Sequence, residues 1–176
     1  MFRLFRRRRA LPPDRRPALE REERILAWAG VDGTDAVIVA TNRGLWLPGR
    51  SSRLGWHEIH KAVWSGSELA ITPAAVVGER DGYQVMVDEP VESYRLTEPG
   101  DVPHHVRQRV TASVAYSRHH PLDGGGVRVV GRRVSGVDGL RWAVRYDPGT
   151  DAASPRVRQQ TAELVRWARD ATTPIG

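Results

Sequence analysis

Short apolar runs separated by turn residues fill the chain from Ile25 to Leu96, and this pattern constrains the fold more than any other feature. Runs such as Ala36 to Thr41 are too short for helices, and turn residues such as Asn42 and Gly44 follow them directly. The expected strands cover 25–31, 36–41, 45–48, 54–59, 61–64, 68–72, 83–87 and 91–96, with 54–64 left open as one bent strand or two. Their spacing of about 8 to 12 residues is typical of an antiparallel sandwich or barrel.

The apolar period changes after Pro99. Valines recur every four residues at Val102, Val106, Val110 and Val114, which predicts an amphipathic helix over 101–117. The glycine run at 124–126 follows and is typical of a flexible linker. The chain thus switches from a series of strands to a mixed α and β segment.

Two alternating runs, 127–134 and 140–146, come after the glycines and predict a β-hairpin. Ser154 and Pro155 are a typical N-cap and first residue of a final helix. Val157, Leu164, Val165 and Ala168 share one face of that helix, whereas Trp167 lies off this face and is a candidate contact for a protein partner. The fold class is therefore α+β.

Three short motifs resemble bacterial pleckstrin-homology-like (PH-like) and GRAM-like domains. They are the strand opening at 22–28 (EERILAW), the hairpin at 39–46 (VATNRGLW) and the segment at 54–59 (LGWHEI). The chain also resembles an uncharacterised family of short proteins from high-GC Gram-positive bacteria, which begin with an arginine-rich tail and a Leu-Pro-Pro step. The resemblance implies a barrel or sandwich of about seven strands capped by a C-terminal helix and extended by a β-hairpin and a final helix.

These assignments divide the chain into a basic, disordered tail (1–19), a PH-like domain (20–117) and a hairpin-plus-helix extension (118–176) packed on the same domain. PH domains that bind phosphoinositides carry lysine and arginine around the first hairpin loop. Here that loop, 31–35, contains Asp32 and Asp35 and no base. The resemblance therefore implies a binding module without assigning its ligand.

The tail is the most basic part of the chain. Its first sixteen residues hold seven arginines and one aspartate, which equals the formal net charge of +6 of the whole protein. Apolar side chains at its tip can enter a lipid interface while guanidinium groups meet anionic headgroups. The expected contacts with a membrane or another anion are Phe2, Arg3, Leu4, Phe5, Arg6, Arg7, Arg8, Arg9, Arg15 and Arg16. Nucleic-acid or ribosome binding, and a merely solvated tail, are the alternatives.

A second basic region spans 118–145, with six arginines and two aspartates. Alternation along 127–134 points Val127 and Val129 inward and Arg128 and Arg132 outward, so that Arg128, Arg132 and Arg133 form a candidate basic surface. Against this, 79–101 holds seven acidic residues and two arginines. Mutual neutralisation of the two regions is the favoured interpretation.

Signatures of catalysis are weak. The chain has no cysteine, and it lacks a G-x-S-x-G nucleophile motif. His57 and His60 are three residues apart, whereas the zincin motif places its histidines four apart, so they are interpreted as ordinary rim histidines like the pairs 104–105 and 119–120. No catalytic residue, metal or cofactor is expected.

The sequence as a whole predicts a non-catalytic binding or adaptor module attached to an anionic membrane surface through its tail. No apolar run reaches the roughly 20 residues that span a bilayer, so the expected location is cytoplasmic, at the inner face of the membrane. The expected partner is an anionic lipid surface or an unidentified protein. The alternative is a nucleic-acid- or ribosome-associated protein that uses the tail and the basic hairpin 127–145. The oligomeric state is left open.

Overall fold

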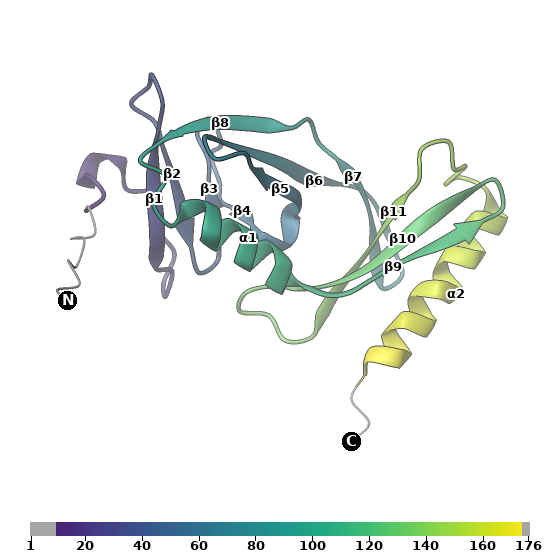
Figure 1. Cartoon of the computed structure of the whole chain (residues 1–176). Helices are drawn as coiled ribbons and strands as arrows, with labels where there is room; N and C mark the ends of the chain where they lie inside the picture. Colours follow the sequence, from purple (N-terminus) through teal and green to yellow (C-terminus); the bar gives the residue numbers. More distant parts are fainter. Residues whose placement is uncertain (1–9, 174–176) are drawn as a thin grey trace, which may run out of the picture.

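A mostly antiparallel sheet of eleven strands and two α-helices confirm the α+β class (Figure 1). The computed structural model describes residues 10–173. The strands are β1 (Ile25–Val31), β2 (Val37–Thr41), β3 (Gly44–Trp46), β4 (Leu54–Gly55), β5 (Ile59–Trp64), β6 (Glu68–Arg80), β7 (Tyr83–Asp88), β8 (Glu92–Thr97), β9 (Val114–Leu122), β10 (Gly125–Arg133) and β11 (Leu140–Tyr146). The helices are α1 (Val102–Ser113) and α2 (Pro155–Thr172), with 3-10 turns η1 (Pro13–Arg15) and η2 (Trp56–Glu58).

A long hairpin connects two regions of the sheet. The thirteen-residue strand β6 pairs with β8 along its first half and with β7 along its second half, so β7 and β8 together form the returning arm. On the outer edge of this arm, β1 pairs with β8 and β11 pairs in parallel with β7. The strand order is β4-β3-β2-β1-β8-β6-β7-β11-β10-β9, with β5 on the other edge of β6.

The first region contains β1–β5, the first half of β6, β8 and α1. Its core includes fully buried Ile38, Leu45, Ile59 and Ile71, and α1 covers it with Val102 and Val106. The helix packs against β5, β1 and η2. The segment 54–64 forms two strands rather than one bent strand, with η2 between β4 and β5.

The predicted helix over 101–117 is too long, since α1 ends at Ser113. From Val114 onward the chain is extended and pairs with β10 along nearly the whole of β9. Val114 continues the four-residue period of the helix, yet the ladder of hydrogen bonds with β10 fixes it as a strand residue. The glycines are also not a flexible linker. Asp123 and Gly124 (φ +71°) form a two-residue turn, and the next two glycines lie in β10.

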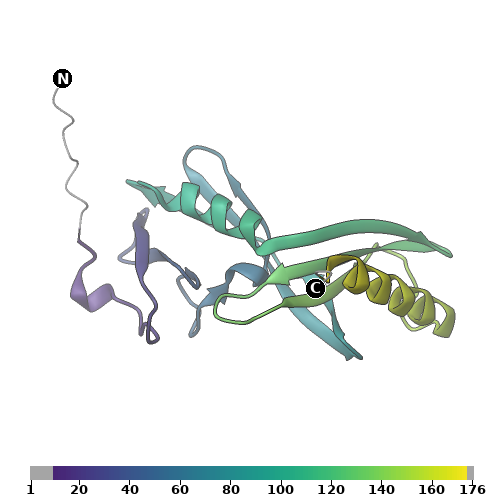
Figure 2. The ribbon, with the colours of Figure 1, turned by 90° about the horizontal axis from the view of Figure 1, so that it is seen from below.

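The second region contains β7, β9–β11 and α2. Val127, Val129, Trp142 and Val144 are buried on one face of the sheet, and α2 packs on that face beside β10 and β9 (Figure 2). The helix begins at Pro155 after Ser154, and it buries Val157, Val165 and Ala168, as the sequence predicts. The predicted hairpin is confirmed as β10–β11. Helix α2 covers one face of this sheet. The side chains on the other face of the sheet point toward the first region.

Candidate anion-binding cleft

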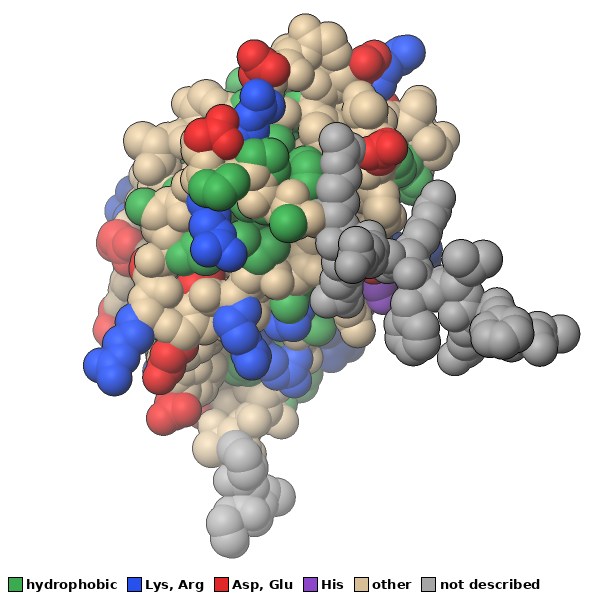
Figure 3. Space-filling model, turned by 90° about the vertical axis from the view of Figure 1, so that its left-hand side faces the viewer, with side chains coloured by type: hydrophobic (Ala, Val, Ile, Leu, Met, Phe, Trp, Pro, Cys, Tyr) green, Lys and Arg blue, Asp and Glu red, His purple; other side chains and the backbone are tan. Residues whose placement is uncertain are grey.

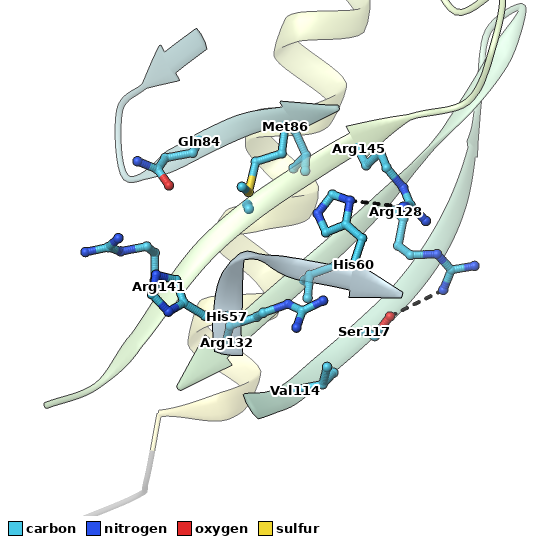
Figure 4. Close-up of a pocket in the computed structure, with 13 residues that line it drawn as sticks. His57, His60, Gln84, Met86, Val114, Ser117, Arg128, Arg132, Arg141 and Arg145 are labelled. Atoms are coloured by element: carbon cyan, nitrogen blue, oxygen red, sulfur yellow. Dashed lines mark hydrogen bonds between the residues drawn. The ribbon is translucent and has the colours of Figure 1, made fainter. Parts of the chain in front are cut away.

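A cavity of about 260 Å³ lies where the open face of the second sheet meets η2 and β5 (Figure 4). The lining side chains come from five segments, namely η2, β5, β7, β9 and the β10–β11 hairpin. The polar ones are His57, His60, Gln84, Ser117, Arg128, Arg132, Arg141 and Arg145, and we call this site the arginine cleft. Met86, Val114, Val130 and Ala143 supply its apolar surface, and Val144, whose side chain is buried in the core under α2, borders it.

Strand register places the four arginines in two cross-strand pairs. Arg128 on β10 lies opposite Arg145 on β11, and Arg132 lies opposite Arg141. Val130 and Ala143 form the pair between them. Residues two apart on a strand share a face, so all six side chains lie on the face that α2 leaves open. Like charges directly opposite each other destabilise a sheet, and this face carries two such pairs.

Few carboxylates compensate this charge. Arg145 donates to Asp88 Oδ1 at 2.7 Å, and Asp88 Oδ1 also lies 2.5 Å from His60 Nδ1. Arg132 instead donates to Ser113 Oγ at 2.8 Å, and Arg128 donates to Ser117 Oγ at 3.3 Å. Among residues 10–173, no carboxylate lies within ion-pair distance of Arg128, Arg132 or Arg141. The cleft therefore offers uncompensated guanidinium groups.

Burial acts on the titratable groups of the cleft in one direction. The Arg132 pKa is lowered by burial and by the nearby charge of Arg145. Burial also lowers the pKa of His57. The negative charge of Glu58 opposes this lowering, and the positive charges of Arg141, Arg132 and Arg53 reinforce it. These effects favour the neutral imidazole in the empty cleft, and an anion would favour the protonated form.

Burial also lowers the pKa of the second histidine, His60, which has a carboxylate in direct contact. The His60 side chain is 11% exposed. The hydrogen bond to the Asp88 carboxylate opposes that shift, while the charges of Arg145 and Arg132 reinforce it. His57 and His60 are therefore cleft-lining groups rather than ordinary rim histidines. Among the residues that the structure describes, no group of three or more His, Asp or Glu side chains is arranged to hold a metal ion.

The prediction that the acidic region 79–101 and the basic region 118–145 neutralise each other is wrong for most of their charges. Asp88 does pair with Arg145, but Glu89 and Glu92 of the acidic region bind Arg50 in the other half of the molecule. The three candidate arginines also separate. Arg128 and Arg132 line the cleft, whereas exposed Arg133 lies outside it and donates to the Ala112 carbonyl at 3.1 Å.

The residues predicted to contact a membrane or another anion are only partly described. Phe2, Arg3, Leu4, Phe5 and Arg6–Arg9 lie outside the described residues. Arg15 pairs with the Asp35 carboxylate at 3.1 Å and also donates to the Asp35 carbonyl, so the acidic loop between β1 and β2 holds the base of the tail. Arg16 is exposed. Neither residue contributes to the arginine cleft.

Two further features bear on partners. Trp167 on α2 is 50% exposed, and the Arg118 guanidinium lies 5.4 Å from its ring centroid. The Trp167 ring therefore makes a cation–π contact within the protein. Neither helix in the described part of the chain has the length and apolar character required to cross a membrane.

Nothing matches this chain in comparisons with protein-family models, with curated proteins and with solved structures. The cleft therefore has to be understood from its own geometry. Sequence reasoning missed Arg141, Arg145, His57 and His60 as members of the site. The alternation that points Arg128 and Arg132 outward applies equally to 140–146, and hairpin pairing would have placed Arg141 and Arg145 beside them. No sequence signal connects His57 or His60 to this face.

Proposed function

We propose that this protein is a non-catalytic binding module that holds an anionic ligand in the arginine cleft. The observation that carries the proposal is the pairing of Arg128 with Arg145 and of Arg132 with Arg141 across the two strands. Among residues 10–173, Arg145 alone of the four has a carboxylate partner. Arginine presents a planar fork of donors that fits phosphate and carboxylate oxygens. A bound anion would compensate charges that the fold leaves uncompensated.

Binding is favoured over catalysis because the polar groups of the cleft are mainly donors. The Asp88 carboxylate, which contacts two lining residues, is held by Arg145 and by His60 Nδ1. Arginine does not lose its proton in proteins, so four arginines favour retention of an anion rather than its conversion.

For the first region we propose a PH-like domain, on two arrangements that support it. Strands β1 to β4 form an antiparallel meander, and β1 pairs with β8. Helix α1 follows β8 directly and covers the core of this region. In the proposed scheme this domain is the frame and the second region carries the ligand site.

Attachment of the tail to an anionic membrane is a separate proposal, which rests on the apolar residues and arginines of 1–9. The base of the tail lies at the β1–β2 end, and the β9–β11 sheet lies at the other end of the molecule (Figure 1). Deletion of 1–9 should therefore abolish cosedimentation with phosphatidylserine-containing vesicles and leave ligand binding in the cleft intact. Equal cosedimentation of the deleted protein would contradict tail attachment.

The cleft proposal is tested with inorganic phosphate and sulfate, measured by calorimetry at low salt. Removal of two charged hydrogen-bond donors in R132Q/R141Q should weaken binding by about 100-fold. R133Q is the matched control, because Arg133 is on the same strand and outside the cleft. Equal losses in both variants would show a diffuse charge effect and would overturn the site.

A further inference from the structure

The two arginine pairs are separated along the strands, which bears on the shape of the ligand. Each pair lies four residues from the other on β10 and on β11. At about 3.3 Å per residue, the backbones of the two pairs are about 13 Å apart. Val130 and Ala143 occupy the space between them, and Met86 lines the same cavity. The floor of the cleft is thus cationic at both ends and apolar in the middle.

The two ends also differ in net charge. At the 128/145 end, Asp88 partly neutralises Arg145 and also contacts His60. At the 132/141 end, His57 is the neighbouring titratable group, and neither arginine has a carboxylate partner among the described residues. Glu58 is close enough to affect the pKa of His57, but its carboxylate accepts the Gly55 N–H at 2.7 Å. The 132/141 end therefore favours the more highly charged anion.

The cavity has the character of a small-molecule site. Its volume of about 260 Å³ is near the lower end of the range for such pockets. Proteins that hold single-stranded nucleic acid supply aromatic rings for successive bases. The imidazoles of His57 and His60 are the ring side chains of this lining, whereas Trp142 and Tyr116 belong to the core under α2.

We propose that the arginine cleft binds a small phosphorylated acid, with its phosphate at the Arg132/Arg141 pair, a singly charged group at the Arg128/Arg145 pair and an uncharged spacer over Val130 and Ala143. This inference rests on the proposed function and adds the ligand class to it. Binding at two linked sites exceeds binding at either alone when the spacer matches the span. The affinity of such a ligand depends on both arginine pairs.

The experiment uses the full chain and phosphonoalkanoic acids with spacers of two, five and ten methylene groups, measured by calorimetry. Hexylphosphonic acid is the single-headed control. The compound with five methylenes should bind on the order of 10²-fold more tightly than hexylphosphonic acid, because its extended chain of about 8 Å and a hydrogen bond of about 2.9 Å at each end together match the separation of the two pairs. The shorter and longer spacers should bind less tightly than the five-methylene compound.

Variants separate the two ends. R128Q/R145Q should remove most of the advantage of the five-methylene compound over hexylphosphonic acid, and it should weaken hexylphosphonic acid itself less than R132Q/R141Q does. R132Q/R141Q should weaken both compounds, and R133Q should weaken neither. Near-ultraviolet circular dichroism, which reports on buried Trp142, checks that each variant is folded.

Three outcomes would overturn the inference, and they differ in what they say of the proposed function. If all compounds bound with equal affinity and R132Q/R141Q still abolished that binding, the anion site would stand and the two-headed ligand would be ruled out. Absence of binding by every compound and by phosphate would remove both. Tighter binding of a single-stranded oligonucleotide that displaces the five-methylene compound would replace the small ligand with nucleic acid.

Discussion

The two regions of the molecule treat arginine in opposite ways. In the first region, Arg43 pairs with Glu20, Arg53 with Glu23, and Arg50 with Glu89 and Glu92. Acidic and basic side chains are accordingly interspersed on the face at the β1 end of the molecule (Figure 3). In the second region, Arg128, Arg132 and Arg141 face a cleft without carboxylate partners among the described residues. The same residue type thus stabilises the fold in one region and is available to a ligand in the other.

Glu23 shows how complete the pairing is in the first region. Its side chain is fully buried, and its two oxygens accept from the Thr41 hydroxyl at 2.7 Å, the Trp46 indole at 3.1 Å, Arg53 at 2.8 Å and the Glu20 N–H at 3.0 Å. Burial alone would raise the pKa of this carboxyl, but these donors and the charge of Arg53 outweigh burial and lower it. A charge with every acceptor site used is structural and leaves nothing for a ligand.

The largest expected effect comes from breaking this network. E23Q should lower the free energy of unfolding by about 3 kcal/mol, because it removes the buried carboxylate that Arg53 contacts at 2.8 Å and leaves Arg53 with the longer contact to Glu20 at 3.4 Å. Urea denaturation measures the loss, and E22Q is the control, since the Glu22 side chain is 79% exposed. The stabilisation from Glu23 is present above the ordinary glutamate pKa and is lost as the pH falls through its lowered value. E23Q should therefore flatten the acid limb of the stability curve, and an unchanged limb would contradict this role.

The second effect tests the cleft by pH. Sulfate is the probe because it does not titrate in this range. In the free protein the pKa values of His57 and His60 are lowered, so both imidazoles are neutral near pH 7. A bound anion favours protonation, and sulfate affinity should therefore rise about tenfold as the pH falls from 8 to 5.

The control for this pH dependence is H57Q/H60Q, in which sulfate affinity should change little between the same two pH values. H104Q, which changes an exposed histidine on α1, should keep the full dependence. An identical pH dependence in H57Q/H60Q and in the unchanged protein would show that the anion binds away from these imidazoles.

A smaller effect is expected at Arg50, which joins the loop after β3 to the β7–β8 arm. Arg50 donates through Nε and a terminal nitrogen to Glu92 at 3.0 and 2.5 Å, and to Glu89 at 3.0 Å. R50Q should lower the free energy of unfolding by about 1 kcal/mol at low salt, and less at high salt, because these groups are partly exposed. The exposed Arg16 supplies the control R16Q. A stability gain in R50Q would mean that paired arginines do not support this region.

Much of the fold could be predicted from local pattern. The β10–β11 hairpin follows from alternation, and α2 follows from its apolar face and from Ser154 and Pro155. Strand β9 could not be predicted in the same way, because Val114 fits the helical period that precedes it. The parallel pairing of β11 with β7 joins Val144 to Val85, far away in sequence, and no local signal specifies it.

The candidate site could be predicted only in part for the same reason. Alternation identifies the outward side chains Arg128 and Arg132, since their neighbours Val127 and Val129 are buried. Whether these arginines meet carboxylates depends on which segments lie across from them, and that is set by the long hairpin rather than by composition. The acidic segment 79–101 is near enough in sequence to suggest neutralisation, yet Glu89, just after β7, and Glu92, at the start of β8, lie against Arg50.

The smallest effect has the opposite sign and separates the two regions most clearly. Arg141 is exposed, lies opposite Arg132 and has no carboxylate partner in the described part of the chain. R141Q removes one of two like charges, and in the absence of ligand it should raise the free energy of unfolding by about 0.5 kcal/mol. The same variant should bind phosphate less tightly, so saturating phosphate should stabilise it less than it stabilises the unchanged protein. Thermal unfolding with and without phosphate measures both effects. A stability loss without ligand would mean that Arg141 supports the sheet, as Arg50 supports the first region.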